Sequence, residues 1–176
     1  MNLRSLVALA VVSASAAAGA AAAQMREPNP LGPASQTRGP SFGLNLNGSE
    51  LGAGATLGYG LGSAFTVFTR AGYAYQNSYV DAGARYSFGR ESSELRPYLE
   101  GALTYVGEAR HGMHSRGFGG TAMIGAEYFI SPKLALDLGV GSSRGRITSF
   151  KLNGEELDME SYFSSPRINV GVKWHP

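Results

Sequence analysis

Two histidines and a serine that could take part in metal binding or catalysis lie in the segment HGMHSRG, residues 111–117. His111 and His114 are three residues apart, but two ligands with no carboxylate in the same loop make a weak metal site. His114 and Ser115 have the residue types of a hydrolase. Catalysis would require the base within hydrogen-bond reach of the nucleophile and a third group that orients the base. Adjacent residues of an exposed loop, which point in opposite directions, supply neither.

Charged residues inside the apparent strands form a more informative set. Each lies on the strand face opposite to an apolar face that carries no charge. Four are cations and four are anions, and three of the cations are Arg. Balanced signs and a preference for Arg are typical of an interior network, because a buried charge needs a partner and hydrogen bonds. We therefore predict that one ionic network joins these eight residues: Arg70, Asp81, Arg85, Glu100, Glu127, Asp137, Arg167 and Lys173.

The elements that position these charges are strands. From Ser41 onward apolar residues alternate with polar or small ones, and turn residues separate the runs. The longer runs reach the 9–11 residues that a tilted strand needs to cross a bilayer. No window after the first 23 residues holds a helical stripe. Eight strands are predicted, at about 41–48, 52–60, 64–75, 78–89, 96–108, 117–130, 133–146 and 163–174.

Two architectures fit strands with one apolar and one polar face. A soluble sandwich or lipocalin-like barrel turns the apolar face inward, whereas a transmembrane barrel turns it to lipid. The polar face here is rich in small residues, as a narrow lumen requires, and its charges balance. Aromatic residues near the strand ends on the apolar face predict an interfacial girdle. The girdle residues are Tyr73, Tyr75, Tyr86, Phe88, Phe118, Tyr128 and Trp174. We predict an all-β fold, an eight-stranded antiparallel up-and-down transmembrane barrel with a packed lumen.

The first 40 residues are predicted to lie outside the barrel. Arg4, the apolar run 6–12 and the alanines at 21–23 are typical of a secretory signal peptide, residues 1–23. Residues 24–40 hold four of the eight prolines and predict a disordered lead-in, with a barrel-plugging segment as the alternative. The barrel domain is then 41–176. An exported chain with no Cys has neither disulfides nor thiolate metal sites, and a net charge of +2 gives no nucleic-acid signature.

The connections predict an orientation. If the chain starts on the periplasmic side, periplasmic turns lie near 60–63, 89–95 and 131–132. External loops then lie near 48–51, 76–77, 109–116 and 147–162. The two longest connections are external, as barrels of this kind prefer.

Three segments carry a resemblance to a known family. RPYLEGALTYVG (96–107), GAEYFISPKLALDLGVG (125–141) and RINVGVKW (167–174) resemble the small outer-membrane β-barrel domain family, which includes porin-like and OmpA-like eight-stranded barrels. The resemblance covers about residues 41–174. It implies an eight-stranded barrel fold, and a final strand read by the barrel-assembly machinery during biogenesis. The chain ends in His175 and Pro176, so Trp174 takes the place of a terminal aromatic residue.

These observations lead to a functional expectation. We expect a monomer in the bacterial outer membrane, with a structural, envelope-integrity or surface-interaction role and no enzyme activity or cofactor. Its partners would be outer-membrane lipids. The external cluster of Arg110, Arg116, Arg144 and Arg146 is interpreted first as an ordinary charged loop rim, with a contact to anionic lipopolysaccharide as the alternative. Nucleic acid is not an expected partner. The alternatives are a small porin-like passive channel or carrier of small or apolar molecules, and a lipid A deacylase-like hydrolase.

Overall fold

The computed structural model describes residues 39–48, 52–74, 77–88, 93–110, 113–153, 155–157 and 161–176. The signal peptide and the lead-in up to residue 38 lie outside these ranges, as do Tyr75 and His111. Gly39 and Pro40, which the sequence places in the lead-in, belong to the first strand. No helix in the described ranges is long and apolar enough to cross a membrane.

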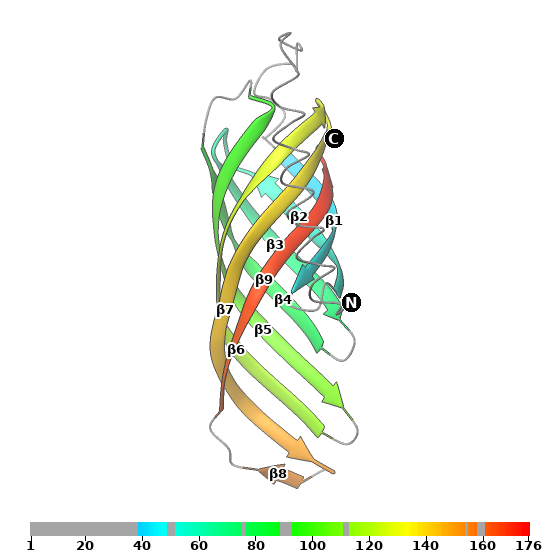
Figure 1. Ribbon diagram of the computed structural model, residues 1–176, viewed down its shortest axis with the longest axis vertical. Coiled ribbons are helices and arrows are strands. Elements are labelled where there is room, and N and C mark those ends of the chain that lie inside the picture. Colours follow the sequence, from blue (N-terminus) through cyan, green and yellow to red (C-terminus); the bar gives the residue numbers. More distant parts are fainter. Residues whose placement is uncertain are drawn as a thin grey trace, which may run out of the picture. The chain divides into compact units, whose positions relative to one another are not determined.

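The described chain forms one antiparallel sheet that closes into a barrel (Figure 1). Each long strand pairs with the next along the chain, and the last pairs with the first. A three-residue strand, β8, adds only to the end of β7. The prediction of an eight-stranded antiparallel up-and-down barrel is confirmed. The strands are β1 (Gly39–Gly48), β2 (Gly52–Gly60), β3 (Phe65–Ala74), β4 (Asn77–Ser87), β5 (Leu95–Arg110), β6 (Met113–Ser131), β7 (Leu134–Leu152), β8 (Glu155–Leu157) and β9 (Ser161–Trp174).

The two ends of the barrel differ. One, which we call the turn end, carries the connections 61–64 and 132–133 and the end of β9. The other, the hairpin end, carries β8 and the tips of β5, β6 and β7, which extend beyond the shorter strands β1 to β4 (Figure 1).

Two loops predicted from the sequence were wrong. Residues 109–116 are mostly strand, since Arg110 pairs with Met113 across a connection of only two residues. The segment 147–162 continues β7 to Leu152 and includes β8 and the start of β9. The physical reason is that backbone hydrogen bonds continue where side-chain alternation fades, because apolar residues beyond the apolar wall no longer keep to the outer face: Ile147 and Phe163 line the lumen. At Asn153 the backbone is left-handed, with φ of 50°, and the chain turns back into β8.

The large apolar side chains point outward. Leu44 and Leu103 are 74% and 77% exposed, whereas the inward-facing Arg70 is 1% exposed. A soluble β protein would show the reverse. Phe118 and Tyr128 are both on the outer face of β6 and are ten residues apart. At about 3.3 Å per residue and a tilt of about 40°, that span is about 25 Å tall, which matches the apolar band of outer-membrane barrels.

The strand register determines the width of the lumen. Successive directly paired residues lead from Phe42 on β1, once around the sheet, to Ser164 on β9. The closing β1–β9 pair instead places Phe42 opposite Trp174, ten residues further along. This stagger tilts the strands, and eight strands enclose an interior that side chains can fill.

Candidate functional site: the charged interior

All eight charged residues of the predicted network lie inside the barrel. None is more than 8% exposed. They come from β3, β4, β5, β6, β7 and β9, so the network spans the lumen rather than following one strand pair.

Arg85 organises the charges near the turn end. Glu127 and Asp137 lie directly opposite each other in the β6–β7 pair, where like charges destabilise a sheet. Arg85 reaches both from β4, with Nη1 2.5 Å from Glu127 Oε1 and Nη2 3.0 Å from Asp137 Oδ2. Lys173 Nζ is 2.7 Å from the same oxygen of Glu127. Cations from other strands therefore neutralise the carboxylate pair.

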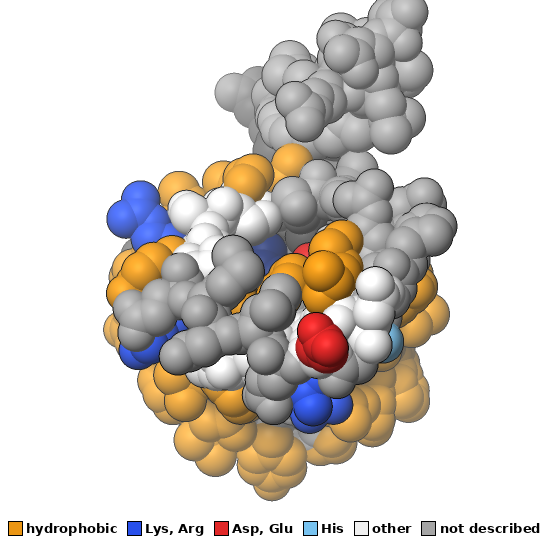
Figure 2. All heavy atoms as spheres, turned by 90° about the horizontal axis from the view of Figure 1, so that it is seen from below, with side chains coloured by type: hydrophobic (Ala, Val, Ile, Leu, Met, Phe, Trp, Pro, Cys, Tyr) orange, Lys and Arg blue, Asp and Glu red, His pale blue; other side chains and the backbone are white. Residues whose placement is uncertain are grey.

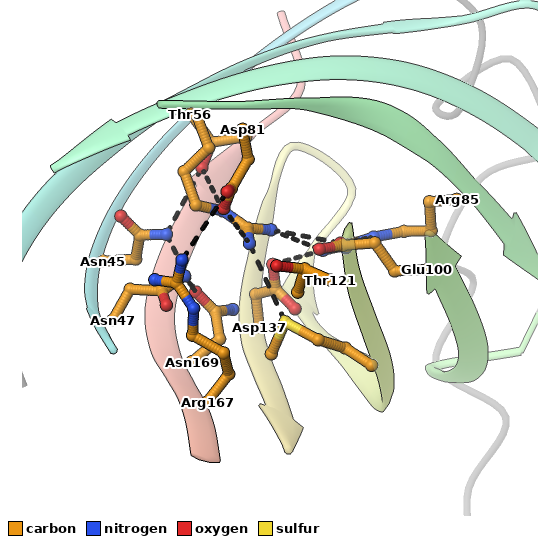
Figure 3. Close-up of polar contacts among 12 residues, drawn as sticks. Asn45, Asn47, Thr56, Asp81, Arg85, Glu100, Thr121, Asp137, Arg167 and Asn169 are labelled. Carbon is orange, nitrogen blue, oxygen red and sulfur yellow. Dashed lines mark hydrogen bonds and ion pairs between the residues drawn. The ribbon is translucent and has the colours of Figure 1, made fainter. Parts of the chain in front are cut away.

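Glu100 joins this cluster to the remaining charges. Its Oε2 accepts hydrogen bonds from Arg85 Nε at 3.1 Å and Nη2 at 2.8 Å, and its Oε1 accepts one from Arg70 Nη2 at 2.8 Å. Arg70 Nη1 is 3.6 Å from Asp81 Oδ2, and Arg167 Nη2 is 3.7 Å from Asp81 Oδ1. The eight charges thus form one connected network, part of which Figure 3 shows.

Hydroxyl groups extend the network toward the hairpin end. Thr104 donates a hydrogen bond to Asp81 Oδ1 at 2.8 Å. The hydroxyl oxygens of Thr104 and Thr121 are 2.6 Å apart, and those of Thr121 and Ser143 2.5 Å. Arg167 Nε donates to Ser143 at 2.6 Å and so completes a closed circuit with Asp81.

Three asparagines fill the lumen beside β1 and β9. Asn45 Nδ2 donates to Asn169 Oδ1 at 2.8 Å and to the Thr56 hydroxyl at 3.3 Å. Asn47 Nδ2 is 3.3 Å from the same Asn169 oxygen (Figure 3). Sequence reasoning missed these amides and the hydroxyls. They share the charge-bearing face of their strands, which was the available signal, but a neutral polar side chain is less distinctive there than a charge.

Each of four buried arginines stacks on an inward-facing aromatic ring, an arrangement that the sequence analysis also missed. Stacking favours the cation because the ring face is electronegative. On β3, β4 and β5 each such aromatic precedes a lumen charge by two residues, which places both on one face. The guanidinium-to-ring distances are 5.0 Å for Arg70 and Phe68, 3.7 Å for Arg85 and Tyr98, 4.8 Å for Arg96 and Phe129, and 4.6 Å for Arg167 and Tyr79.

A ring pair occupies the turn end of the lumen. His175, just past β9, is 6% exposed, and its ring centroid is 5.4 Å from that of Phe129. Its backbone N–H donates to the Lys133 carbonyl at 2.8 Å. Burial, together with the nearby charge of Lys173, lowers the pKa of His175 to about 4. The imidazole is therefore neutral at pH 7.

The packed part of the interior ends at a cavity of about 190 Å³ on the hairpin side. Asn47, Tyr79, Ser143 and Arg167 are among its lining residues, and apolar side chains of Val106, Ile147 and Phe163 line it further out. Between this cavity and the His175 ring, the lumen holds the ionic network.

Comparisons with solved structures agree with the barrel fold. No protein-family model matches the chain, and no curated protein sequence is significantly similar to it. Solved structures are similar. The N-terminal β-barrel domain of Pseudomonas aeruginosa OprF is 17% identical with a TM-score of 0.54, over 77% of this chain and 97% of that one. The outer membrane protein OprG of the same organism is 10% identical with a TM-score of 0.56, over 81% of this chain and 98% of that one. Neisserial surface protein A is 19% identical with a TM-score of 0.50, over 78% of this chain and 94% of that one.

The fold is that of the small outer-membrane barrels. The resemblance inferred from the three sequence segments is confirmed at the level of fold.

The outer wall of this outer-membrane barrel fold carries the girdle residues that the structure describes. Tyr73, Tyr86, Phe88, Phe118 and Trp174 are 42–60% exposed, and Tyr128 is half-buried. The expectation that Phe118 lies near a strand end was wrong, because β6 begins five residues earlier, at Met113. Tyr75 lies outside the described residues.

The histidine and serine singled out for catalysis do not form a site. His114 and Ser115 are consecutive in β6, and consecutive strand residues face opposite sides of the sheet. His114 is exposed on the outer wall, and Ser115 lines the lumen cavity. In the described part of the chain no group of three or more His, Cys, Asp or Glu side chains is arranged to hold a metal ion.

Proposed function

We propose that this protein is an integral, monomeric barrel of the bacterial outer membrane with a structural or surface-interaction role. The observation that carries the proposal is the connected ionic network, because it fills the lumen from Lys173 to Arg167 with paired, buried charges. Ions crossing the barrel would have to displace these pairs. We infer that the lumen is closed.

The shape of the barrel supports an orientation in the membrane. The three connections at the turn end, 61–64, 88–94 and 132–133, are at most seven residues long, whereas at the hairpin end β5, β6 and β7 extend beyond the shorter strands. Outer-membrane barrels keep short turns in the periplasm and longer segments outside. We therefore place the hairpin end on the cell surface, where the tips of β5, β6 and β7 would be accessible.

The final strand supports a biogenesis partner. β9 alternates buried lumen residues such as Arg167 and Lys173 with outward Ile168 and Val172, and it ends in the exposed Trp174. We propose that the barrel-assembly machinery recognises this strand.

Planar-bilayer recording of the purified, refolded protein tests the closed lumen. Folding is established first by a faster migration of the unboiled than of the boiled sample in gels, and a porin serves as positive control for the bilayer. We expect no stable conductance from the wild-type barrel. Stable, reproducible steps would contradict the proposal and support a passive channel.

A matched pair of double variants makes the experiment sharper. Arg70→Ser with Glu100→Ser removes one cation and one anion from the lumen, with their mutual contact and their contacts to Asp81 and Arg85, and leaves the net charge unchanged. Arg144→Ser with Glu155→Ser makes the same change at exposed positions. We expect conductance from the first double variant only.

A further inference from the structure

Three arginines gather on the outer wall near the hairpin end. Arg116 lies on β6, and Arg144 and Arg146 lie on β7. All three are exposed, and they alternate with Gly117, Ser143 and Gly145, which face the lumen. Figure 2, which views the barrel from the hairpin end, shows Lys and Arg side chains at the margin of the apolar outer wall.

These cations begin where the apolar band ends. On the outer face of β7, Leu134, Leu136, Leu138 and Val140 are followed by Ser142, Arg144 and Arg146. On β6, Arg116 precedes Phe118, the aromatic residue at the margin of the band. The register places Arg146 directly between Phe118 and Tyr162, and Phe118 next to Tyr105. The arginines therefore lie at the level where lipid headgroups meet the acyl chains.

The neighbours of Arg116 and Arg144 leave room for a ligand. Arg116 lies between Gly107 and Ser149 on the adjacent strands. Arg144 lies between Gly120 and Ser164. These four neighbours are small and none is acidic, so a bulky anionic group can approach both guanidinium groups from the side.

We propose that Arg116, Arg144 and Arg146 bind the phosphate groups of lipid A in the outer leaflet. Guanidinium groups bind phosphate oxygens in a bidentate manner. Lipid A carries two phosphates on one rigid disaccharide, which suits three cations on two neighbouring strands better than the single phosphate of a phospholipid does. Its acyl chains would lie along Phe118, Tyr105 and the apolar wall below them. This site rests on the proposed outer-membrane location with the hairpin end outward.

Native mass spectrometry of the refolded barrel in detergent micelles tests the site. The probes are lipid A with two phosphates, lipid A from which both phosphates have been removed, and phosphatidylglycerol, each without divalent cations. We expect the bisphosphorylated form to bind wild type at least tenfold more tightly than either other lipid. The triple variant Arg116→Gln, Arg144→Gln, Arg146→Gln should lose at least tenfold in affinity for it.

Lys133→Gln provides the control, because it removes an exposed cation at the turn end, and we expect unchanged affinity. The heat-dependent gel shift of every variant establishes that it is folded. Equal binding of bisphosphorylated lipid A by wild type and the triple variant would overturn the site, as would equal binding of the dephosphorylated form. If phosphatidylglycerol bound the wild type as tightly as bisphosphorylated lipid A, the proposed selectivity for lipid A would be wrong, and the site would bind anionic lipids in general. A conducting wild-type barrel would instead contradict the closed lumen and leave these affinities unaffected.

Discussion

Arg85 contacts three carboxylates, those of Glu100, Glu127 and Asp137, and stacks on the ring of Tyr98. Burying a charge costs several kcal/mol, and only close partners offset that cost. With Arg85 removed, Glu127 would keep Lys173, but Asp137 would lose its cation.

Replacement of Arg85 by Met should therefore destabilise the barrel by about 3–5 kcal/mol, the typical cost of breaking a buried ion pair from one side. Arg85→Lys should cost less, since it keeps the charge but loses the forked geometry and the stacking. Urea unfolding of the barrel in lipid vesicles measures both. Lys133→Met, at an exposed cation, is the control and should change stability by less than about 0.5 kcal/mol. An equal effect of the control and Arg85→Met would refute the role of Arg85.

His175 makes stability depend on pH at the turn end. Its pKa is about 4 in the folded barrel, against an ordinary value of 6.5. Between about pH 6.5 and 4 the unfolded chain takes up a proton at this position and the folded barrel does not. Stability from the neutral ring is therefore fully present above pH 6.5 and is lost as pH falls toward 4, by about 2 kcal/mol between pH 7 and 4.5.

The His175→Phe variant isolates this effect, because Phe keeps a ring beside Phe129 and does not titrate. Its free energy of unfolding should fall less than that of wild type between pH 7 and pH 4.5, by about the same 2 kcal/mol. Urea titrations at the two pH values measure the difference. Identical pH dependence in the two proteins would assign it to other groups.

At the level of elements, glycines in β6 and β7 make room for a side chain of β5. Tyr98 pairs directly with Gly125, which in turn pairs with Gly139. The Tyr98 ring lies over both glycines, and its hydroxyl donates to Asp137 Oδ1 at 2.7 Å. A Cβ at Gly139 would lie 2.6 Å from that hydroxyl oxygen. Three neighbouring strands therefore depend on one aromatic ring.

Gly125→Ala should destabilise the barrel by about 1–3 kcal/mol, because the new methyl group would overlap the Leu138 carbonyl oxygen of β7 and the Tyr98 ring. Gly101→Ala is the matched control. It lies in the middle of β5, and a Cβ there would meet no atom within 4 Å. Urea unfolding should show the loss for Gly125→Ala alone, and similar midpoints for the two variants would show that β7 and the Tyr98 ring adapt without cost.

The alternation of apolar and polar side chains predicted the strand bounds accurately within the apolar band and inaccurately beyond it. The sequence placed the start of β6 at residue 117, four residues late, because His114 and Arg116 on the outer face are polar, as is Ser115 on the inner one. At residues 113–116 only the backbone pairing with β5 and β7 defines the strand, and the side-chain pattern gives no sign of it. The turn at Asn153 was detectable, since Asn followed by Gly between two strands is a strong hairpin signal.

At the scale of the whole molecule, the sequence identified which charges face inward but not which of them meet. Because side chains along a strand alternate between its two faces, the sequence places Arg85 and Asp137 on the lumen face. Their contact joins strands that are not neighbours, and it depends on the stagger with which the sheet closes. That stagger is a property of all the strand pairs together, so no single segment encodes it. Arg96 is on the same strand face as Tyr98 and Glu100, which was the available signal, whereas His175 lies just past the end of β9, where alternation no longer assigns a face.

The pairing of β1 with β9 also has a topological meaning. Phe42 and Trp174 are direct partners, and their ring centroids are 5.9 Å apart. The long strands thus form a closed ring. In this ring β9 and β1, the last and first strands of the chain, are neighbours like any other pair, although no loop connects them. A gene rearranged to join these two strands by a short linker and to open the chain between β5 and β6 would encode the same ring of contacts in a new order.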